Sequence, residues 1–169
     1  MSRFEFIDPK KAADAIELIG KEWMLIGAAD GDRANAMTAS WGTVGTLWGK
    51  PVCICYIRPQ RYTFGLAEKS DRLSFSFFGK NCREALAYCG KASGRDGDKL
   101  ADAGLEYEMI DGVPLFSDAR MTLVCRKLYS DWLREGSFVD REVLDTCYPD
   151  RDLHKYYICE IEKCIVAKN

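Results

Sequence analysis

Residues 52–63 read Val-Cys-Ile-Cys-Tyr-Ile-Arg-Pro-Gln-Arg-Tyr-Thr, and they join the clearest strand of the sequence to the start of a helix. The first half of this stretch is rich in β-branched, aromatic and small apolar residues, which is the composition of a buried strand. Pro59 then favours the first turn of a short helix that we expect to continue to about Glu68. The sequence therefore predicts a strand that delivers Arg58 and Arg61 to a helix N-terminus.

The rest of the chain consists of short segments bounded by turns. Strands are expected at 23–29, 34–41, 73–78, 121–129 and 156–167, and short helices at 8–20, 83–89, 96–103 and 140–146. Gly42, Gly45 and Gly49 favour a turn-rich surface loop after the second strand. Sequential strands without strand–helix–strand alternation predict a mainly β fold with α additions, namely an antiparallel barrel with short helices. No linker or repeat divides the chain, so residues 1–169 are expected to form a single domain.

Charge and hydropathy exclude several classes of protein. The chain has 24 Lys and Arg against 26 Asp and Glu, giving a formal net charge of −2. This balance argues against a nucleic-acid partner that is held by a basic surface. No stretch reaches the roughly 18 apolar residues of a membrane helix, and the charged first residues do not resemble a signal peptide. We therefore expect a cytoplasmic protein with neither a nucleic acid nor a membrane as partner.

The eight cysteines lie within apolar runs and lack paired spacing. Cys53 and Cys55 flank Ile54, and there is no Cys-x-x-Cys motif. His154 is the only histidine, so the sequence shows no ligand set for zinc and we expect no metal. The pattern is typical of reduced cysteines that act as small buried hydrophobic residues, not of a disulfide framework.

Residues 35–41, Asn-Ala-Met-Thr-Ala-Ser-Trp, combine small and hydroxyl side chains on a predicted strand. Small side chains allow a ligand to approach the backbone, and Thr38 and Ser40 alternate onto one face. Arg58 and Arg61 at a helix N-terminus form a potential anion site. Each segment alone is more often structural, but together they indicate a flat heteroaromatic ligand that carries a phosphate.

Several motifs in order resemble the flavin reductase-like family, and within it the flavoredoxin group most closely. These motifs are residues 35–41, residues 58–63, the stretch Cys-Gly-Lys-Ala-Ser-Gly-Arg-Asp-Gly-Asp-Lys at 89–99, residues 136–140 and residues 154–161. The resemblance runs from about residue 20 to the end of the chain. It implies an FMN-binding split β-barrel of Greek-key type, and a homodimer with FMN near the interface. It also implies that NADH, NADPH or a redox protein serves as electron donor.

The same resemblance implies the site residues. Its FMN-binding positions are Asn35, Met37, Thr38, Ala39, Ser40, Trp41, Arg58, Arg61, Tyr62, Thr63, Ser93, Arg95 and Lys99. His154 matches a histidine near the flavin in some relatives, and it is the candidate catalytic residue. The flavin itself carries the electrons, so the protein is expected to supply position and electrostatics.

Three functions are open at this stage. The first is an FMN-dependent oxidoreductase of the NAD(P)H:flavin reductase type. The second is a flavin-binding module or electron carrier that serves a protein partner without turnover of its own. The third is a scaffold that has lost its cofactor. Flavin uptake separates the third from the others, and nicotinamide oxidation separates the first from the second.

Overall fold

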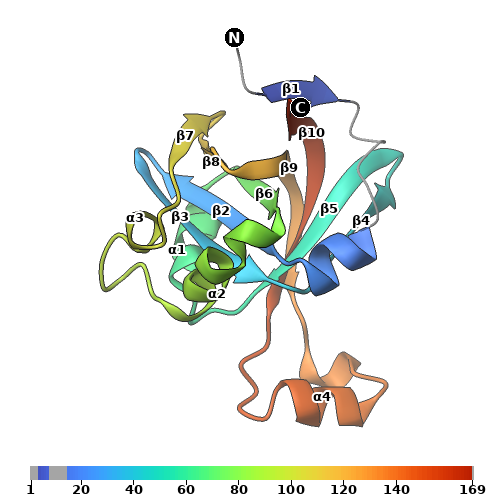
Figure 1. The fold of residues 1–169 in the computed structure, drawn as a ribbon. Helices are drawn as coiled ribbons and strands as arrows, with labels where there is room; N and C mark the ends of the chain where they lie inside the picture. The colour runs from blue at the N-terminus through green and yellow to red at the C-terminus, as the bar shows by residue number, and fades with distance from the viewer. Residues whose placement is uncertain (1–3, 8–14, 169) are drawn as a thin grey trace.

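Antiparallel strands dominate the computed structural model, which describes residues 4–7 and 15–168 (Figure 1). The main sheet contains β1 (Phe4–Ile7), β2 (Met24–Asp30), β3 (Arg33–Ala39), β4 (Gly42–Leu47), β5 (Lys50–Ile57), β6 (Arg72–Phe78), β9 (Ala119–Trp132) and β10 (Lys155–Ala167). Their order is β3-β2-β6-β9-β10-β5-β4, and β1 also pairs with β10. A separate hairpin is formed by β7 (Tyr107–Ile110) and β8 (Val113–Phe116). The predicted mainly β fold class is confirmed.

The split in the barrel lies between the first and last strands of this order. β3 and β4 follow one another in the chain and are joined by Ser40 and Trp41, but each pairs with only one other strand. The sheet therefore stays open along their edges. Because β3 is an edge strand, the backbone groups on its outer side are not used by a neighbouring strand.

Short helices surround the barrel. They are η2 (Ile16–Lys21), α1 (Tyr62–Lys69), η3 (Lys80–Cys82), α2 (Arg83–Lys91), α3 (Lys99–Asp102), η4 (Glu135–Ser137) and α4 (Arg141–Cys147). Of the helix predicted at 8–20, residues 8–14 lie outside the described part of the chain, and the remainder corresponds to η2. Helix α1 begins at Tyr62, three residues after Pro59, because the Arg61 amide first closes a turn onto the Arg58 carbonyl at 3.1 Å.

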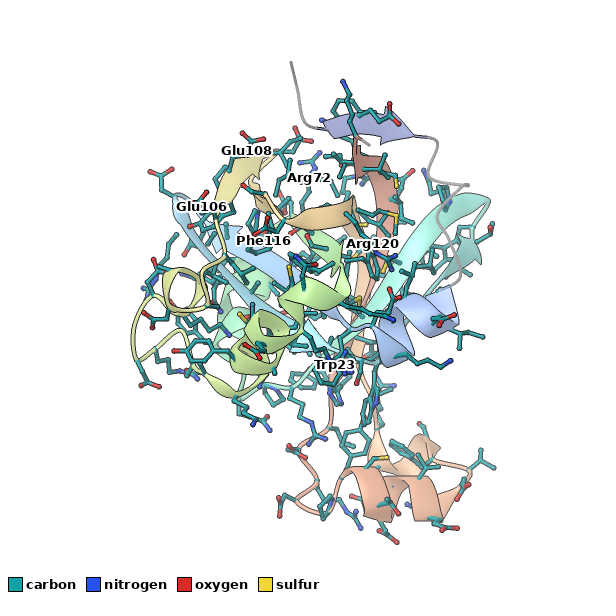
Figure 2. The ribbon with its side chains drawn as sticks, in the orientation of Figure 1. Trp23, Arg72, Glu106, Glu108, Phe116 and Arg120 are labelled. Carbon is teal, nitrogen blue, oxygen red and sulfur yellow. The ribbon has the colours of Figure 1, made fainter. Side chains whose placement is uncertain are left out.

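Three apolar clusters hold these layers together, the smallest being Val113, Leu115, Val124 and Ile165. The first fills the barrel and includes Met24, Phe75 and Tyr157, each with no exposed surface or almost none. The second lies under α2, and Phe116 of the β7–β8 hairpin joins it (Figure 2). All eight cysteines are free thiols, and all but Cys147 are buried. The prediction of reduced, buried cysteines is confirmed.

The predicted loop after β3 is wrong, because residues 42–47 form β4 and pair with β5. Trp48 and Gly49 have φ values of 53° and 70°, which makes them a two-residue turn with the left-handed backbone that hairpins favour. Gly42 lies where a Cβ would come within 2.9 Å of the Ile54 carbonyl oxygen, so its glycine serves close strand packing. Glycine in this segment marks a strand, not a loop. The β7–β8 hairpin was also not predicted.

The longest strands, β9 and β10, continue beyond the barrel and carry a projection that we call the α4 arm, residues 133–154. Figure 1 shows α4 standing apart from the barrel at the bottom of the view. Asp140 caps the first turn of α4, where its carboxylate accepts from the amides of Glu142 and Val143. The base of the arm is closed by the Leu133 amide, which donates to the His154 carbonyl at 2.9 Å. The arm returns the chain to the barrel directly beside the end of β5.

Candidate functional site

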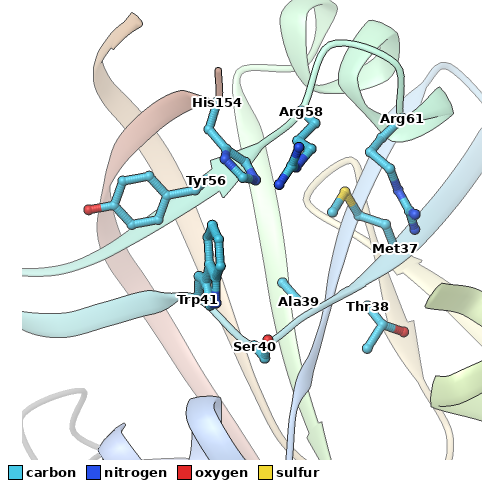
Figure 3. A pocket seen from close by; sticks show the side chains of 9 residues that line it. All are labelled: Met37, Thr38, Ala39, Ser40, Trp41, Tyr56, Arg58, Arg61 and His154. Carbon is cyan, nitrogen blue, oxygen red and sulfur yellow. The ribbon is translucent and has the colours of Figure 1, made fainter. Parts of the chain in front are cut away.

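A pocket of about 200 Å³ opens beside the free end of β3 (Figure 3). It is lined by Met37, Thr38, Ala39, Ser40, Trp41, Tyr56, Arg58, Arg61 and His154. All but Tyr56 were singled out from the sequence. Figure 3 shows Trp41, Tyr56 and His154 gathered on one side, with Arg58 next to His154 and Arg61 farther along. The fold thus brings residues from β3, β5, the start of α1 and the end of the α4 arm into one place.

Successive side chains of β3 point to opposite faces of the strand. Thr38 points towards α2, where its hydroxyl donates to the Leu86 carbonyl at 2.5 Å. Met37 and Ala39 pack against the barrel cluster. Ser40 is exposed at the strand end. Because the side chains are small and the outer edge is unpaired, the backbone amides of β3 are the donors that a flat ligand at this edge would meet.

Arg61 and Lys99 form a cationic pair at the C-terminus of α2. Arg61 donates to the carbonyls of Gly90 at 2.7 Å and Cys89 at 3.2 Å. Lys99 is 3% exposed and donates to the carbonyls of Cys89 and Ala92 at 3.1 and 3.2 Å. Burial lowers the pKa of Lys99 to about 8 and also lowers the pKa of Arg61. Among the described residues no carboxylate pairs with either cation, so their charge is left for an anion.

The start of α1 adds further donors to this region. Arg61 is the N-cap residue, and no side chain caps the first turn. The first amides of a helix lack partners within the helix and favour an anion. Helix α1 therefore presents free amides next to the two cations.

A buried hydrogen bond between Asn35 and Thr63 connects β3 to the first turn of α1. The Asn35 side-chain amide donates to the Thr63 hydroxyl at 2.8 Å, and both residues are buried. Gly94 packs against this pair so closely that a Cβ would lie 2.7 Å from Asn35 Oδ1 and 2.6 Å from Tyr62 Cδ1. These residues support the site and are not on the surface of the pocket.

The loop that follows α2 covers the other side of Tyr62. Arg33 and Arg95 lie over the Tyr62 ring at 5.1 and 5.6 Å from its centroid. The Arg95 side chain donates to the Gln60 carbonyl at 3.0 Å, and its amide donates to the Ser93 hydroxyl at 3.2 Å. The fold therefore places Asn35, Tyr62, Thr63, Ser93, Arg95 and Lys99 next to the pocket but not in its lining.

His154 is buried among aromatic rings at the pocket wall. It is 7% exposed, its Nδ1 is 2.7 Å from the Tyr148 hydroxyl, and its ring centroid is 5.3 Å from that of Trp41. Burial, and then the charge of Arg58, lower the pKa of His154 to about 4. Sequence reasoning missed Tyr56 and Tyr148. Side chains alternate along β5, so Tyr56 lies on the face opposite the buried cysteines of that strand, and this signal could have identified it. Nothing in the sequence indicated that Tyr148 belongs near the pocket.

We expect His154 to stay neutral throughout the physiological range. Because it is the only histidine, its ring proton resonances report its titration without overlap, and the midpoint should lie near pH 4 instead of about 6.5. Below pH 6.5 the unfolded chain takes up this proton and the folded chain does not, so the free energy of unfolding should fall as pH decreases to about 4.

The His154→Gln variant lacks this titration and is the control. Its unfolding free energy should decrease less than that of the wild type between pH 7 and pH 4.5 in urea titrations. A midpoint near 6.5 in the folded wild-type protein would contradict a buried, neutral His154.

The fold and the site together define a split β-barrel whose pocket lies at the open strand edge. The family model of the flavin reductase like domain matches residues 17–169, so the chain belongs to the flavin reductase-like family. The resemblance inferred from the sequence motifs is thereby confirmed. Curated proteins include no match to this chain.

Solved structures share this fold. The FMN-binding domain of a flavin reductase-like enzyme from Shewanella baltica has a TM-score of 0.69 at 17% identity, covering 97% of this chain and 77% of that one. Flavoredoxin of Desulfovibrio vulgaris has a TM-score of 0.68 at 19% identity, covering 86% and 69%. An FMN-binding protein from Thermus thermophilus with bound p-hydroxybenzaldehyde has a TM-score of 0.64 at 24% identity, covering 84% and 69%. At these identities the likeness concerns the fold.

Two further findings concern metals and membranes. Within the described ranges, no three His, Cys, Asp or Glu side chains are grouped so that they could hold a metal ion. None of the helices in the described part of the chain combines the length and hydropathy needed to span a bilayer.

Proposed function

We propose that this protein binds FMN and acts as a flavin reductase or flavoredoxin-like oxidoreductase, passing electrons from a nicotinamide or another donor to an acceptor. One observation supports the proposal. The end of the edge strand β3 and Arg61, the N-cap residue of α1, line the same pocket, and no carboxylate pairs with Arg61 among the described residues. A flat ring with a phosphate at the end of a flexible chain has the shape and charge that this pocket fits. Membership of the flavin reductase-like family supports the same cofactor.

The residues present fit each part of FMN. A phosphate monoester carries about 1.5 to 2 negative charges at pH 7, which the α1 amides, Arg61 and the neighbouring Lys99 would balance. Ala39 and Ser40 are small enough for the ring to lie against the β3 backbone. The amides there would donate to the acceptor atoms of the ring. The bound flavin would supply the two-electron chemistry.

The chain's own residues have three tasks in this chemistry. The β3 amides would hold the ring in place, and donors fixed in position would stabilise negative charge that develops beside them. Trp41 and Tyr56 form an aromatic side of the pocket, against which the ring would pack. His154 is neutral and its Nδ1 is engaged with Tyr148, so it contributes a hydrogen bond or packing and no positive charge at pH 7.

Flavin binding and turnover test the proposal in two steps. Protein mixed with FMN and freed of excess ligand should be yellow, and its absorption should bleach when a reductant is added without oxygen. Steady oxidation of NADH or NADPH in the presence of free flavin would then identify an enzyme. Bleaching without nicotinamide turnover would indicate the alternative, an electron carrier for a protein partner. A colourless protein that takes up no FMN would rule out both.

We also propose a cytoplasmic homodimer. Large apolar side chains are exposed on the described surface, with Trp48 59% and Val139 101% exposed. An open barrel with unpaired edges and such side chains favours association with a second copy. The eight free thiols favour a reducing compartment.

A further inference from the structure

The α4 arm has little apolar packing to hold it against the barrel. Leu144 is the buried residue of α4, and Tyr148 just after it is 3% exposed, whereas Val139 and Val143 are 101% and 45% exposed. Figure 1 shows the arm extending away from the other helices. Its position therefore depends on a few specific contacts near its base.

Arg58 makes the main polar contacts across this junction. One terminal nitrogen of its guanidinium is ion-paired with Asp152, and the other donates to the Cys147 carbonyl at 3.0 Å. The guanidinium also lies over the Tyr148 ring, 5.1 Å from its centroid. Both terminal nitrogens thus have partners on the arm, in contrast to Arg61, whose partners are carbonyls of α2.

Asp152 depends on Arg58 for charge compensation. Its Oδ2 accepts from Arg58 and from the Gln60 side chain, the latter at 2.5 Å. Its Oδ1 is buried and has no hydrogen-bond donor within the described chain. The hydrogen bond from Arg58 holds the pKa of Asp152 below its usual range. Removal of Arg58 would leave a partly buried carboxylate without its cation, which is strongly unfavourable.

Tyr148, which Arg58 contacts, lies behind the pocket wall that Trp41 and His154 line. Tyr148 bonds to His154 through its hydroxyl, and the two rings pack at 5.4 Å. Trp41 packs against both, with centroid distances of 6.3 Å to Tyr148 and 5.3 Å to His154. The geometry of this aromatic wall therefore follows the position of the arm.

We propose that Arg58 is a positioning residue that latches the α4 arm to the end of β5 and so sets the aromatic wall of Trp41, Tyr148 and His154. With the proposed function, a planar electron donor or acceptor would enter the pocket beside this wall, which Trp41 and His154 line. The role of the aromatic wall toward a donor or acceptor rests on the proposed function, whereas the contact of Arg58 with the α4 arm does not. The role differs from the one expected from the sequence, in which Arg58 and Arg61 both serve the phosphate.

The test compares Arg58→Ala, Arg58→Lys and Asp152→Asn with a matched control. Arg72→Ala removes a similar arginine–carboxylate pair, with Glu162, far from the site; its side chains are 36% and 26% exposed, against 27% and 23% for Arg58 and Asp152. The first readout is the titration of His154 by NMR. In Arg58→Ala the midpoint should move from about 4 towards about 6.5, because a nearby positive charge is lost and the wall loosens. In Arg72→Ala it should stay near 4.

The second readout is limited digestion with trypsin. The arm contains exposed Arg134, Arg141 and Arg151, so cleavage there should become severalfold faster once the latch is broken. Arg58→Lys keeps the charge but lacks the second planar donor. Its rate of cleavage should therefore lie between those of the wild type and Arg58→Ala. With flavin bound, the KM for the electron donor should rise severalfold in Arg58→Ala, while kcat changes less.

Each of the other outcomes either contradicts the contact between Arg58 and the arm or gives Arg58 a different role. If Arg58→Ala has the same His154 midpoint and the same digestion rate as Arg72→Ala, the position of the arm does not depend on Arg58. A loss of FMN affinity much larger than the loss of riboflavin affinity would make Arg58 a phosphate ligand. Should Arg58→Ala fail to fold, Asp152→Asn breaks the same pair from the arm and must give the same faster digestion. Its His154 midpoint is not expected to rise through charge, because the Asp152 carboxylate itself raises the pKa of His154 and Arg58 keeps its positive charge. Failure of the wild type to bind flavin would refute the proposed function, while titration and digestion still decide the latch.

Discussion

The Arg61→Ala variant should bind FMN about ten- to a hundredfold more weakly than the wild type, while riboflavin affinity stays close to the wild-type value. Arg61 has no carboxylate partner in the described chain: its guanidinium donates to carbonyls at the C-terminus of α2, and the residue itself is the N-cap of α1, whose first turn no side chain caps. A charge-assisted contact with a phosphate is typically worth about 1.5–3 kcal/mol, and riboflavin lacks that group. Flavin fluorescence quenching, measured for both ligands, gives the two dissociation constants.

The matched control for this comparison is Lys69→Ala, at the opposite end of the same helix. Lys69 pairs with Asp30 at 2.5 Å on the surface, so its removal changes the net charge by the same amount without touching the pocket. Both flavins should bind this variant as they bind the wild type. Equal losses for FMN and riboflavin in Arg61→Ala would show that Arg61 supports the fold or the ring, and not the phosphate.

The Gly94→Ala variant should lose stability and flavin affinity together. A Cβ at this position would lie 2.6 Å from Tyr62 Cδ1 and 2.7 Å from Asn35 Oδ1, distances that force both side chains to move. Overpacking of this kind typically costs about 1–3 kcal/mol. Because Asn35 bonds to Thr63 in the first turn of α1, the shift should also displace the anion site. Urea unfolding and flavin titration measure the two effects.

Gly90→Ala is the contrasting substitution a few residues earlier. Gly90 lies within α2, and a Cβ there would be 3.6 Å from the Thr38 Cβ, an ordinary contact. Alanine in a helix interior is favoured over glycine by roughly 0.5–1 kcal/mol, so this variant should be as stable as the wild type or more stable. Gly94→Ala with unchanged stability would contradict the close packing against Tyr62 and Asn35.

The elements that local composition predicted are those in which one face is plainly buried. β5 and β6 were found because their apolar residues leave few alternatives to a strand. β4 was not found, because its glycines resemble those of a loop and the close packing of Gly42 depends on Ile54 and Met24, which are distant in the sequence. The β7–β8 hairpin is short, and the burial of β8 is a tertiary effect that depends on its contacts with β2, β6 and β9.

Arg58 and Arg61 show most clearly what required the folded chain. They are three residues apart, identical in chemistry, and equally suited to a phosphate when only the sequence is considered. Arg61 meets Gly90, 29 residues away, and Arg58 meets Asp152, 94 residues away. The sequence alone determined the barrel class, the buried cysteines and the segments that gather at the pocket, because these depend on local hydropathy and on motif order. Only the tertiary structure decided that Arg61 bonds to carbonyls of α2 and that Arg58 bonds to the α4 arm, because a side chain's partner depends on where distant segments of the chain lie.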